Sequence, residues 1–235
     1  MIYVTSDLHG CAPECLQQLL GKANFGSEDF LFVLGDVIDR GNHGVELLNW
    51  MSMQPNVQLM LGNHESLLLG CAFLFDTVTD SSIAKLDTSH LEMFQTWMLN
   101  GGNPTVTGLR NLKRQDPDAV DGILDYLREA PLYEEVSVGD ADYLLVHAGL
   151  ANFDPARPVN SYTADELLWA RPSLDDRYFV DKTVIFGHTP SHYYGSEYQG
   201  RAVKTDTWLC IDTGAAGGGS PMLYCLDNKK EYYIE

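Results

Sequence analysis

The chain has 235 residues, 45% of them hydrophobic, and a formal net charge of −18 at pH 7. This length allows one sizeable hydrophobic core, so we expect a single domain over residues 1–235. The acidic balance argues against a nucleic-acid partner, which would need a basic face, and no stretch is apolar enough to suggest a membrane span.

The first part of the chain alternates short aliphatic runs with amphipathic segments. The runs predict strands at Ile2–Ser6, Phe30–Leu34 and Val57–Leu61, and the segments predict helices at Ala12–Lys22 and Gly44–Met53. This alternation indicates parallel strands with helices covering the sheet. Because the first strand begins so early and the five cysteines are scattered, we expect no signal peptide and a reduced, cytoplasmic location.

The pattern changes after His64. From Glu65 to about Ala130 the apolar spacing is helical, which predicts a helical insertion at about 65–130 beside the preceding sheet. Its predicted helices are Leu67–Phe75, Leu91–Leu99 and Ala119–Glu129. The rest of the chain is strand-rich and suggests antiparallel hairpins. Its predicted strands are Leu132–Val138, Tyr143–Val146, Thr183–Phe186, Trp208–Ile211, Met222–Leu226 and Tyr232–Ile234.

Polar clusters follow the predicted strands. Asp7-Leu8-His9 follows the first strand, Gly35–Gly41 the second and Gly62–Glu65 the third, and two histidines end later strands. Polar residues at the carboxyl edge of an α/β sheet commonly build a site. Oxygen ligands mixed with imidazoles suit one or two divalent cations, and two adjacent cations form a phosphate-ester-cleaving centre. The candidate ligands are Asp7, His9, Asp36, Asn63, His147 and His188.

Five motifs in order resemble those of the calcineurin-like metallophosphoesterases, and within them the PPP-type serine/threonine protein phosphatases of compact bacterial and phage type. The motifs are Asp7–Gly10, Gly35–Gly41, Gly62–Glu65, His147–Gly149 and Gly187–Thr189, so the resemblance covers most of the chain. Two further segments, Asn100–Thr105 and Leu167–Arg171, are also similar to the bacterial enzymes. The expected fold is α/β (α+β in some schemes), with two mixed β-sheets packed as a sandwich flanked by helices.

The resemblance implies a role for each motif residue. The first metal ion would be held by Asp7, His9 and Asp36, and the second by Asp36, Asn63, His147 and His188. The expected ions are two Mn²⁺, with Fe or Zn²⁺ also compatible with these ligands. A hydroxide that bridges the two ions would attack phosphorus directly. Around it, His64 would be the general acid, Asp39 would orient His64, and Arg40 and Arg171 would bind the phosphoryl oxygens.

The implied function is a phosphoprotein phosphatase acting on phosphoserine and phosphothreonine, with phosphotyrosine not excluded, so the expected partner is a phosphoprotein or phosphopeptide. The alternative is a hydrolase of dinucleoside polyphosphates such as diadenosine tetraphosphate. Those hydrolases usually depart from Asp-Arg in the second motif and have Asp after Gly-Asn-His, so Asp39, Arg40 and Glu65 favour the phosphatase. A metal-binding scaffold without turnover is disfavoured, because every ligand position and His64 are intact.

Several residues also admit a structural interpretation. Arg40 could pair with Asp39 instead of binding phosphate, and the register of Arg171 is not fixed by the sequence. Cys11 and Cys15 could form half of a zinc site, but without a second pair they are better explained as small apolar residues. The Gly214–Gly219 run lacks the Lys-Ser/Thr of a P-loop and predicts a turn beside the site.

Overall fold

The computed structural model describes residues 1–75 and 87–234 and contains two five-stranded sheets. The strands are β1 (Ile2–Thr5), β2 (Phe30–Val33), β3 (Val57–Leu59), β4 (Tyr133–Val138), β5 (Ala141–Val146), β6 (Thr183–Phe186), β7 (Val203–Lys204), β8 (Trp208–Cys210), β9 (Met222–Cys225) and β10 (Glu231–Tyr233). The α-helices are α1 (Pro13–Ala23), α2 (Gly44–Ser52), α3 (Asn63–Gly70), α5 (Thr88–Leu99), α6 (Asn103–Gln115), α7 (Pro117–Glu129) and α8 (Ala164–Leu168). Among the described helices, none combines the length and the apolar character needed to cross a membrane.

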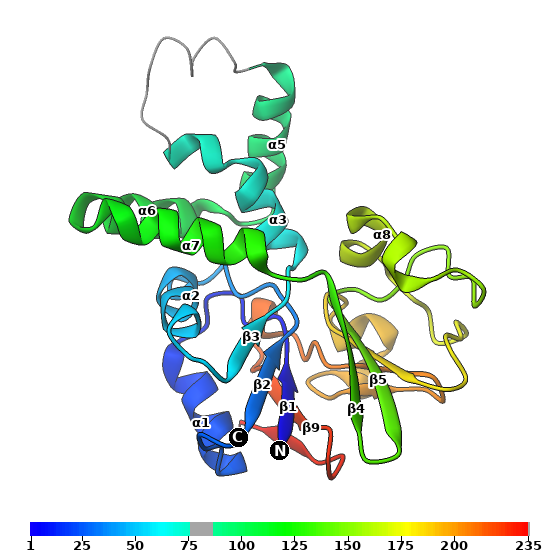
Figure 1. Cartoon of the computed structure of the whole chain (residues 1–235). Helices are drawn as coiled ribbons and strands as arrows, with labels where there is room; N and C mark the ends of the chain where they lie inside the picture. Colours follow the sequence, from blue (N-terminus) through cyan, green and yellow to red (C-terminus); the bar gives the residue numbers. More distant parts are fainter. Residues whose placement is uncertain (76–86, 235) are drawn as a thin grey trace.

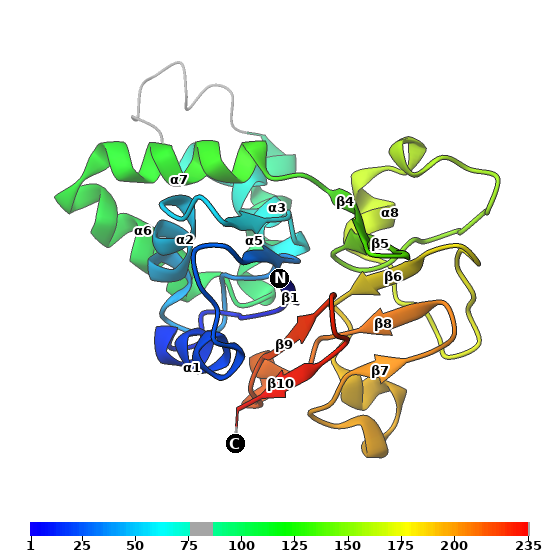
Figure 2. The same cartoon turned by 60° about the horizontal axis from the view of Figure 1, so that its bottom comes forward.

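Both sheets mix parallel and antiparallel pairs. The first has the order β10-β9-β1-β2-β3 and the second β4-β5-β6-β8-β7. Strands β1, β2 and β3 are parallel, as are β5, β6 and β8. Figure 1 shows α1 and α2 beside the first sheet and α3 and α5 to α7 beyond its upper end. Figure 2 shows the two sheets next to each other, with α8 on the side of the second.

Alternating side chains along the strands explain the sandwich. In β1, Tyr3 packs into the cluster beneath the helices of the first sheet, whereas Val4 packs into the cluster between the sheets. In β5, Leu145 enters the same central cluster while Leu144 faces the outer cluster of the second sheet. Strands β1 and β5 therefore bury side chains on both of their faces. The predicted class, two mixed sheets flanked by helices, is confirmed.

The insertion contains more helix than the sequence predicts. Helix α6 was not predicted, because Gly101-Gly102 reads as a break, yet Pro104 is well placed in a first helical turn. The predicted helix Leu67–Phe75 divides into α3 and a short 3-10 turn at Ala72–Phe75. Residues 76–86 of the predicted insertion lie outside the described residues. The short helix α8, which follows the capping residue Thr163, was also not predicted.

Tight loops join the carboxyl ends of the parallel strands to the next elements. Asp7 and Asp36 both have φ of 54°, in the left-handed region that Asp tolerates better than most residues. At Gly35, φ is +86° and an added Cβ would collide with the backbone of Gly62. This close approach places the loop after β2 directly against the start of α3.

Candidate active site

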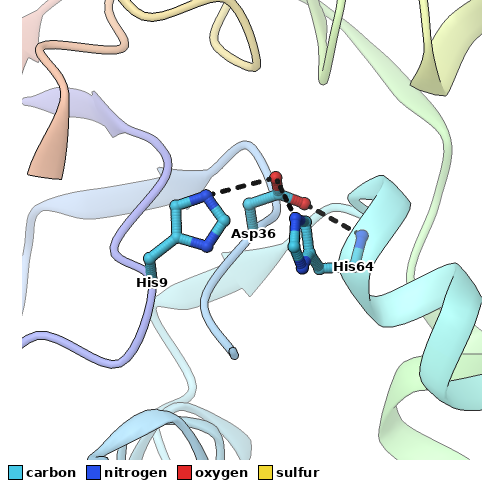
Figure 3. Close-up of side chains that lie close together, drawn as sticks. All are labelled: His9, Asp36 and His64. Carbon is cyan, nitrogen blue, oxygen red and sulfur yellow. Dashed lines mark hydrogen bonds and ion pairs between the residues drawn. The ribbon is translucent and has the colours of Figure 1, made fainter. Parts of the chain in front are cut away.

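The structure brings all six predicted ligand residues together. Each is at most 7% exposed, and they come from the carboxyl ends of β1, β2, β5 and β6 and from the start of α3. In the first sheet, Asp36 Oδ2 lies 3.5 Å from His9 Nε2. On the other side, Asp36 Oδ1 lies 3.4 Å from His147 Nε2. Asp36 is therefore the residue shared by both halves of the site, and Figure 3 shows it between His9 and His64.

Two groups of side chains have the geometry to hold a cation. His9, Asp36 and His64 form one group and Asp36, His147 and His188 the other, each with its potential ligand atoms within 4.8 Å of one another. The Oδ1 of Asn63 lies 2.9 Å from both His147 Nε2 and His188 Nδ1. These donors are oxygens and imidazole nitrogens, which suit divalent transition metals.

Unpartnered polar atoms support a metal centre. Asp7 Oδ1 and His188 Nε2 are buried and have no hydrogen-bond partner among the described residues. Burial and the neighbouring Asp36 raise the pKa of Asp7 to about 8. Burial also opposes ionisation of Asp36, but His147 and His64 outweigh it and lower the pKa of Asp36. Without a cation these groups are costly to bury, so the site fits positive charge.

Glu65, to which the sequence analysis assigned no catalytic role, holds the loop that carries Asp36 in place. Its side chain is fully buried and accepts hydrogen bonds from the backbone N–H groups of Asp36 and Val37, both at 2.8 Å. It also accepts one from Gly62 N at 3.1 Å. Glu65 thus links the loop after β2 to the start of α3 and fixes two of the candidate ligands, Asp36 and Asn63, relative to each other.

The predicted acid, His64, is held by a network that reaches into the insertion. Its Nδ1 lies 2.6 Å from Asp39 Oδ2, as the resemblance implies. Asp39 also accepts hydrogen bonds from Trp97 Nε1 at 2.9 Å and Thr105 Oγ1 at 2.5 Å. Helices α5 and α6 therefore position Asp39. Burial disfavours charge on His64, but Asp36 and Asp39 outweigh it and raise the pKa of His64 to about 9.

The two predicted phosphate-binding arginines line the mouth of the site. Arg40 and Arg171 are exposed and both border a pocket of about 90 Å³ above the candidate ligands. Arg40 Nη2 lies 3.3 Å from His64 Nε2. Within the described chain Arg40 forms no ion pair with Asp39, whose oxygens are occupied by His64, Trp97 and Thr105. The geometry therefore favours the phosphate-binding interpretation of Arg40.

Asp212 is a site residue that the sequence analysis missed. It is 3% exposed, lines the same pocket and accepts a hydrogen bond from Gly214 N at 2.9 Å. Burial and Asp7 raise its pKa well above the usual range. The sequence held a signal for it, because Asp212 follows a short apolar run, as Asp7 and Asp36 do. The adjoining 214–219 segment forms the expected turn, around a 3-10 turn at Ala215–Gly217.

One further histidine and two cysteines lie apart from the ligand groups. His43 is exposed and contacts Glu46, with its Nδ1 3.0 Å from Glu46 Oε2. Cys11 and Cys15 are partly buried free thiols, and neither belongs to a metal-ligand group among the described residues.

The metal-free protein should lose stability as the pH rises from 6.5 to 9. In the folded protein the pKa values of Asp7, Glu65 and His64 are raised to about 8, 7 and 9, so each group keeps its proton to a higher pH than in the unfolded chain. The stability that each contributes is complete below its unfolded pKa and disappears as the pH passes its folded pKa. His9 and His188, whose pKa values burial lowers, are neutral in both states above pH 6.5 and do not oppose this trend.

We expect the melting temperature of chelator-treated protein to fall by roughly 5 °C across this range. The control is the same protein with saturating Mn²⁺, for which the fall should be smaller because a cation stabilises the ionised Asp7. A melting temperature that stays level or rises without metal would contradict the raised pKa values.

Two curated proteins that are similar to this chain in sequence carry the same name. A protein of Acidovorax ebreus (strain TPSY) is 28% identical over 177 residues, which cover 71% of this chain and 47% of that protein. A protein of Actinobacillus succinogenes is 30% identical over 159 residues, covering 63% of this chain and 44% of that protein. Both are named symmetrical bis(5′-nucleosyl)-tetraphosphatase. This chain spans less than half the length of each of these relatives.

Solved structures share the fold. A putative diadenosine tetraphosphatase aligns with a TM-score of 0.64 at 17% identity and covers 99% of this chain, with 92% of its own length matched. A cold-active protein tyrosine phosphatase aligns with a TM-score of 0.56 at 18% identity, covering 98% of this chain and 74% of that structure. At these identities the likeness concerns the fold alone.

The prediction of a phosphoprotein phosphatase with a phosphoprotein partner is wrong, because the curated relatives are named as dinucleoside tetraphosphatases. The structure explains the error. Asp39 and Glu65, which favoured the phosphatase, are completely buried and hold His64 and the loop of Asp36. Neither side chain is positioned to contact a substrate. Arg40 faces the pocket, but a phosphoryl group is common to both substrate classes.

The assignment of this chain to a protein family does not depend on that error. Its sequence profile, described as calcineurin-like phosphoesterase, matches residues 1–214, which include every candidate ligand. The family implies a two-metal centre, and the structure supplies two groups of candidate ligands that share Asp36. The fold, the site and this match lead to one conclusion: the chain belongs to the calcineurin-like phosphoesterase family.

Proposed function

We propose that this chain hydrolyses dinucleoside tetraphosphates symmetrically, giving two nucleoside diphosphates. The observation that carries the proposal is the match to curated relatives of that name, which extends over 71% of the chain in one case. The site is consistent with it. Arg40 and Arg171 border a pocket whose volume of about 90 Å³ suits one phosphoryl group, with room for the rest of the substrate outside.

Six side chains would hold two divalent ions. The first ion would be held by Asp7, His9 and Asp36, and the second by Asp36, Asn63, His147 and His188. Two such ions, when bound, neutralise phosphate charge and lower the pKa of a water molecule that attacks phosphorus.

The other proposed roles belong to side chains of the protein itself. Arg40 and Arg171 would bind the oxygens of the attacked phosphoryl group through planar, forked donors. His64 would donate the proton on Nε2 to the departing oxygen, because its Nδ1 is engaged by Asp39. The oxygen of the attacking water would bond to the phosphorus that is second from one nucleoside, and one proton of that water would pass to solvent. The bond from this phosphorus to the bridging oxygen would break, and this oxygen, protonated by His64, would leave on a nucleoside diphosphate.

The products of diadenosine tetraphosphate hydrolysis test the proposal. The purified protein is incubated with this substrate and Mn²⁺, and the nucleotides are separated by chromatography. We expect ADP to be the sole product. When excess chelator is present, we expect no ADP to form. In parallel, a phosphoserine peptide is supplied at the same concentration and should release phosphate far more slowly. Formation of AMP and ATP, or faster hydrolysis of the peptide, would overturn the proposal.

A further inference from the structure

A second cavity adjoins the candidate active site. It has a volume of about 370 Å³ and is lined by the segment that follows β5 and the segment that precedes β6. We call it the side cavity, and its lining residues include Asn152, Phe153, Arg171, Pro172, Arg177 and Tyr178. Arg171 also borders the 90 Å³ pocket above the candidate ligands. The two spaces are therefore neighbours with an arginine between them.

One wall of the side cavity is aromatic and firmly held. The ring of Phe153 meets those of Tyr178 and Phe179 edge-on, at centroid distances of 5.1 and 4.8 Å. Tyr178 is 5% exposed, and its hydroxyl oxygen accepts a hydrogen bond from Leu150 N at 2.9 Å. These ring contacts therefore hold the half-buried side chain of Phe153 in place. An aromatic surface of this kind suits a nucleobase, which stacks on or packs against aromatic rings.

Other lining residues of the side cavity are cationic. Arg171 and Arg177 both line the side cavity in a chain with only 15 lysine and arginine residues against 33 acidic ones. Arg177 Nη1 donates to the backbone carbonyls of Leu174 at 2.8 Å and Asp176 at 3.0 Å, which fixes one edge of its guanidinium group. Asp176 also lines the cavity, but its Oδ2 accepts a hydrogen bond from Ser173 N at 2.6 Å. The two arginines therefore offer a local site for anionic phosphates.

The sizes of the two spaces match the parts of an extended substrate. The pocket of about 90 Å³ is suited to one phosphoryl group, whereas about 370 Å³ falls in the range of pockets that bind small organic molecules. A dinucleoside tetraphosphate needs both, because its reacting phosphate is separated from the nearer nucleoside by one further phosphate. Arg171 lies where the phosphate chain would pass from one space to the other.

We propose that the side cavity binds one nucleoside end of the substrate. The base packs against Phe153, Arg177 binds the phosphate next to the nucleoside, and Arg171 binds the attacked phosphoryl group at the point where the chain passes between the two spaces. The assignment rests on the proposed function and extends it. Because the cavity and the candidate ligands are fixed relative to each other, seating the nucleoside also determines which phosphorus reaches the ligands. The cavity would therefore make the cleavage symmetrical.

The test compares a large and a small substrate. The kcat/KM values for diadenosine tetraphosphate and for 4-nitrophenyl phosphate, which has no nucleoside, are measured for the wild type, Arg177→Ala and Phe153→Leu. We expect the ratio of the two values to fall about tenfold in each variant. The matched control is Arg114→Ala, which removes an exposed arginine of α6 whose Nη1 contacts only Asn111 Oδ1, at 3.3 Å, among the described residues. Its ratio should equal that of the wild type.

A binding measurement separates this inference from the proposed function. Calorimetry with ADP and the chelator-treated protein needs no metal and no turnover. We expect ADP to bind to the wild type and its affinity to fall about tenfold or more in Arg177→Glu, which reverses the charge at an exposed position. Wild-type affinity in this variant, or an unchanged kcat/KM ratio in Arg177→Ala, would overturn the side-cavity assignment. If ADP binding depends on Arg177 but diadenosine tetraphosphate is not hydrolysed, the cavity assignment stands and the proposed function fails.

Discussion

Replacing Asp36 with asparagine should remove nearly all phosphoesterase activity, with a loss of about 1000-fold or more in kcat/KM. Asp36 is the residue common to both candidate ligand groups, and its two oxygens face opposite halves of the site, 3.5 Å from His9 Nε2 and 3.4 Å from His147 Nε2. Asparagine has nearly the same shape but no charge. Two adjacent cations would then lose the anion that both of them share.

Metal content distinguishes this explanation from a general loss of structure. The variant is loaded with Mn²⁺ and dialysed, and bound metal is measured by mass spectrometry together with kcat/KM for 4-nitrophenyl phosphate. We expect fewer than two bound ions and an intact fold by circular dichroism. Asp121→Asn, at an exposed position of α7, is the matched control and should retain metal and activity. Wild-type metal content and turnover in Asp36→Asn would refute the shared-ligand assignment.

The position of the candidate ligands could be predicted because it follows from strand geometry. Parallel strands align their carboxyl ends at one edge, so Asp7 and Asp36 had to come near each other once β1 and β2 were recognised. His147 and His188 were recognised as residues at strand ends, but the parallel pairing of β5 and β6 was not predicted, because the sequence analysis suggested antiparallel hairpins in this part of the chain. Asp212 follows β8, the next parallel strand, and could have been found in this way.

The supporting contacts could not be predicted from local pattern. Trp97 and Thr105 hold Asp39 from helices α5 and α6, across 58 and 66 residues of chain. Helical periodicity identifies which face of a helix is apolar, but it does not specify which polar side chain of another element will reach it. Thr105 belongs to a helix that the sequence analysis did not predict at all. The insertion therefore serves the site through contacts that only the tertiary fold reveals.

The substrate class was misjudged for a related reason. The motifs that were compared contain the candidate metal ligands and the general acid. These groups act in the hydrolysis of many kinds of phosphate ester. In the side-cavity proposal, the features that distinguish a nucleotide from a peptide lie outside those motifs, in the segments that carry Phe153, Arg171 and Arg177. These segments are largely irregular, so no hydrophobic period marks their conformation in the sequence. Arg171 was predicted only through its resemblance to a family segment.

Replacing His64 with asparagine should slow hydrolysis by an amount that depends on the leaving group. A general acid contributes about 100- to 10,000-fold when the departing oxygen is strongly basic, and much less when it is a weak base. With its pKa raised to about 9, His64 carries its proton at neutral pH and can donate it. We expect the largest loss on an alkyl phosphate, an intermediate loss on phenyl phosphate and the smallest on 4-nitrophenyl phosphate. Diadenosine tetraphosphate, whose leaving group is a nucleoside diphosphate, should resemble the last of these.

The same variant separates two roles that the geometry allows for His64. Its ring belongs to a potential ligand group with His9 and Asp36, yet its Nδ1 is engaged by Asp39 at 2.6 Å. If His64 is the acid, the variant keeps both metal ions and its losses follow the basicity of the leaving group. His43→Asn, at an exposed histidine that contacts Glu46, is the matched control and should change neither property. Equal losses on all substrates, together with a lost ion, would instead make His64 a ligand.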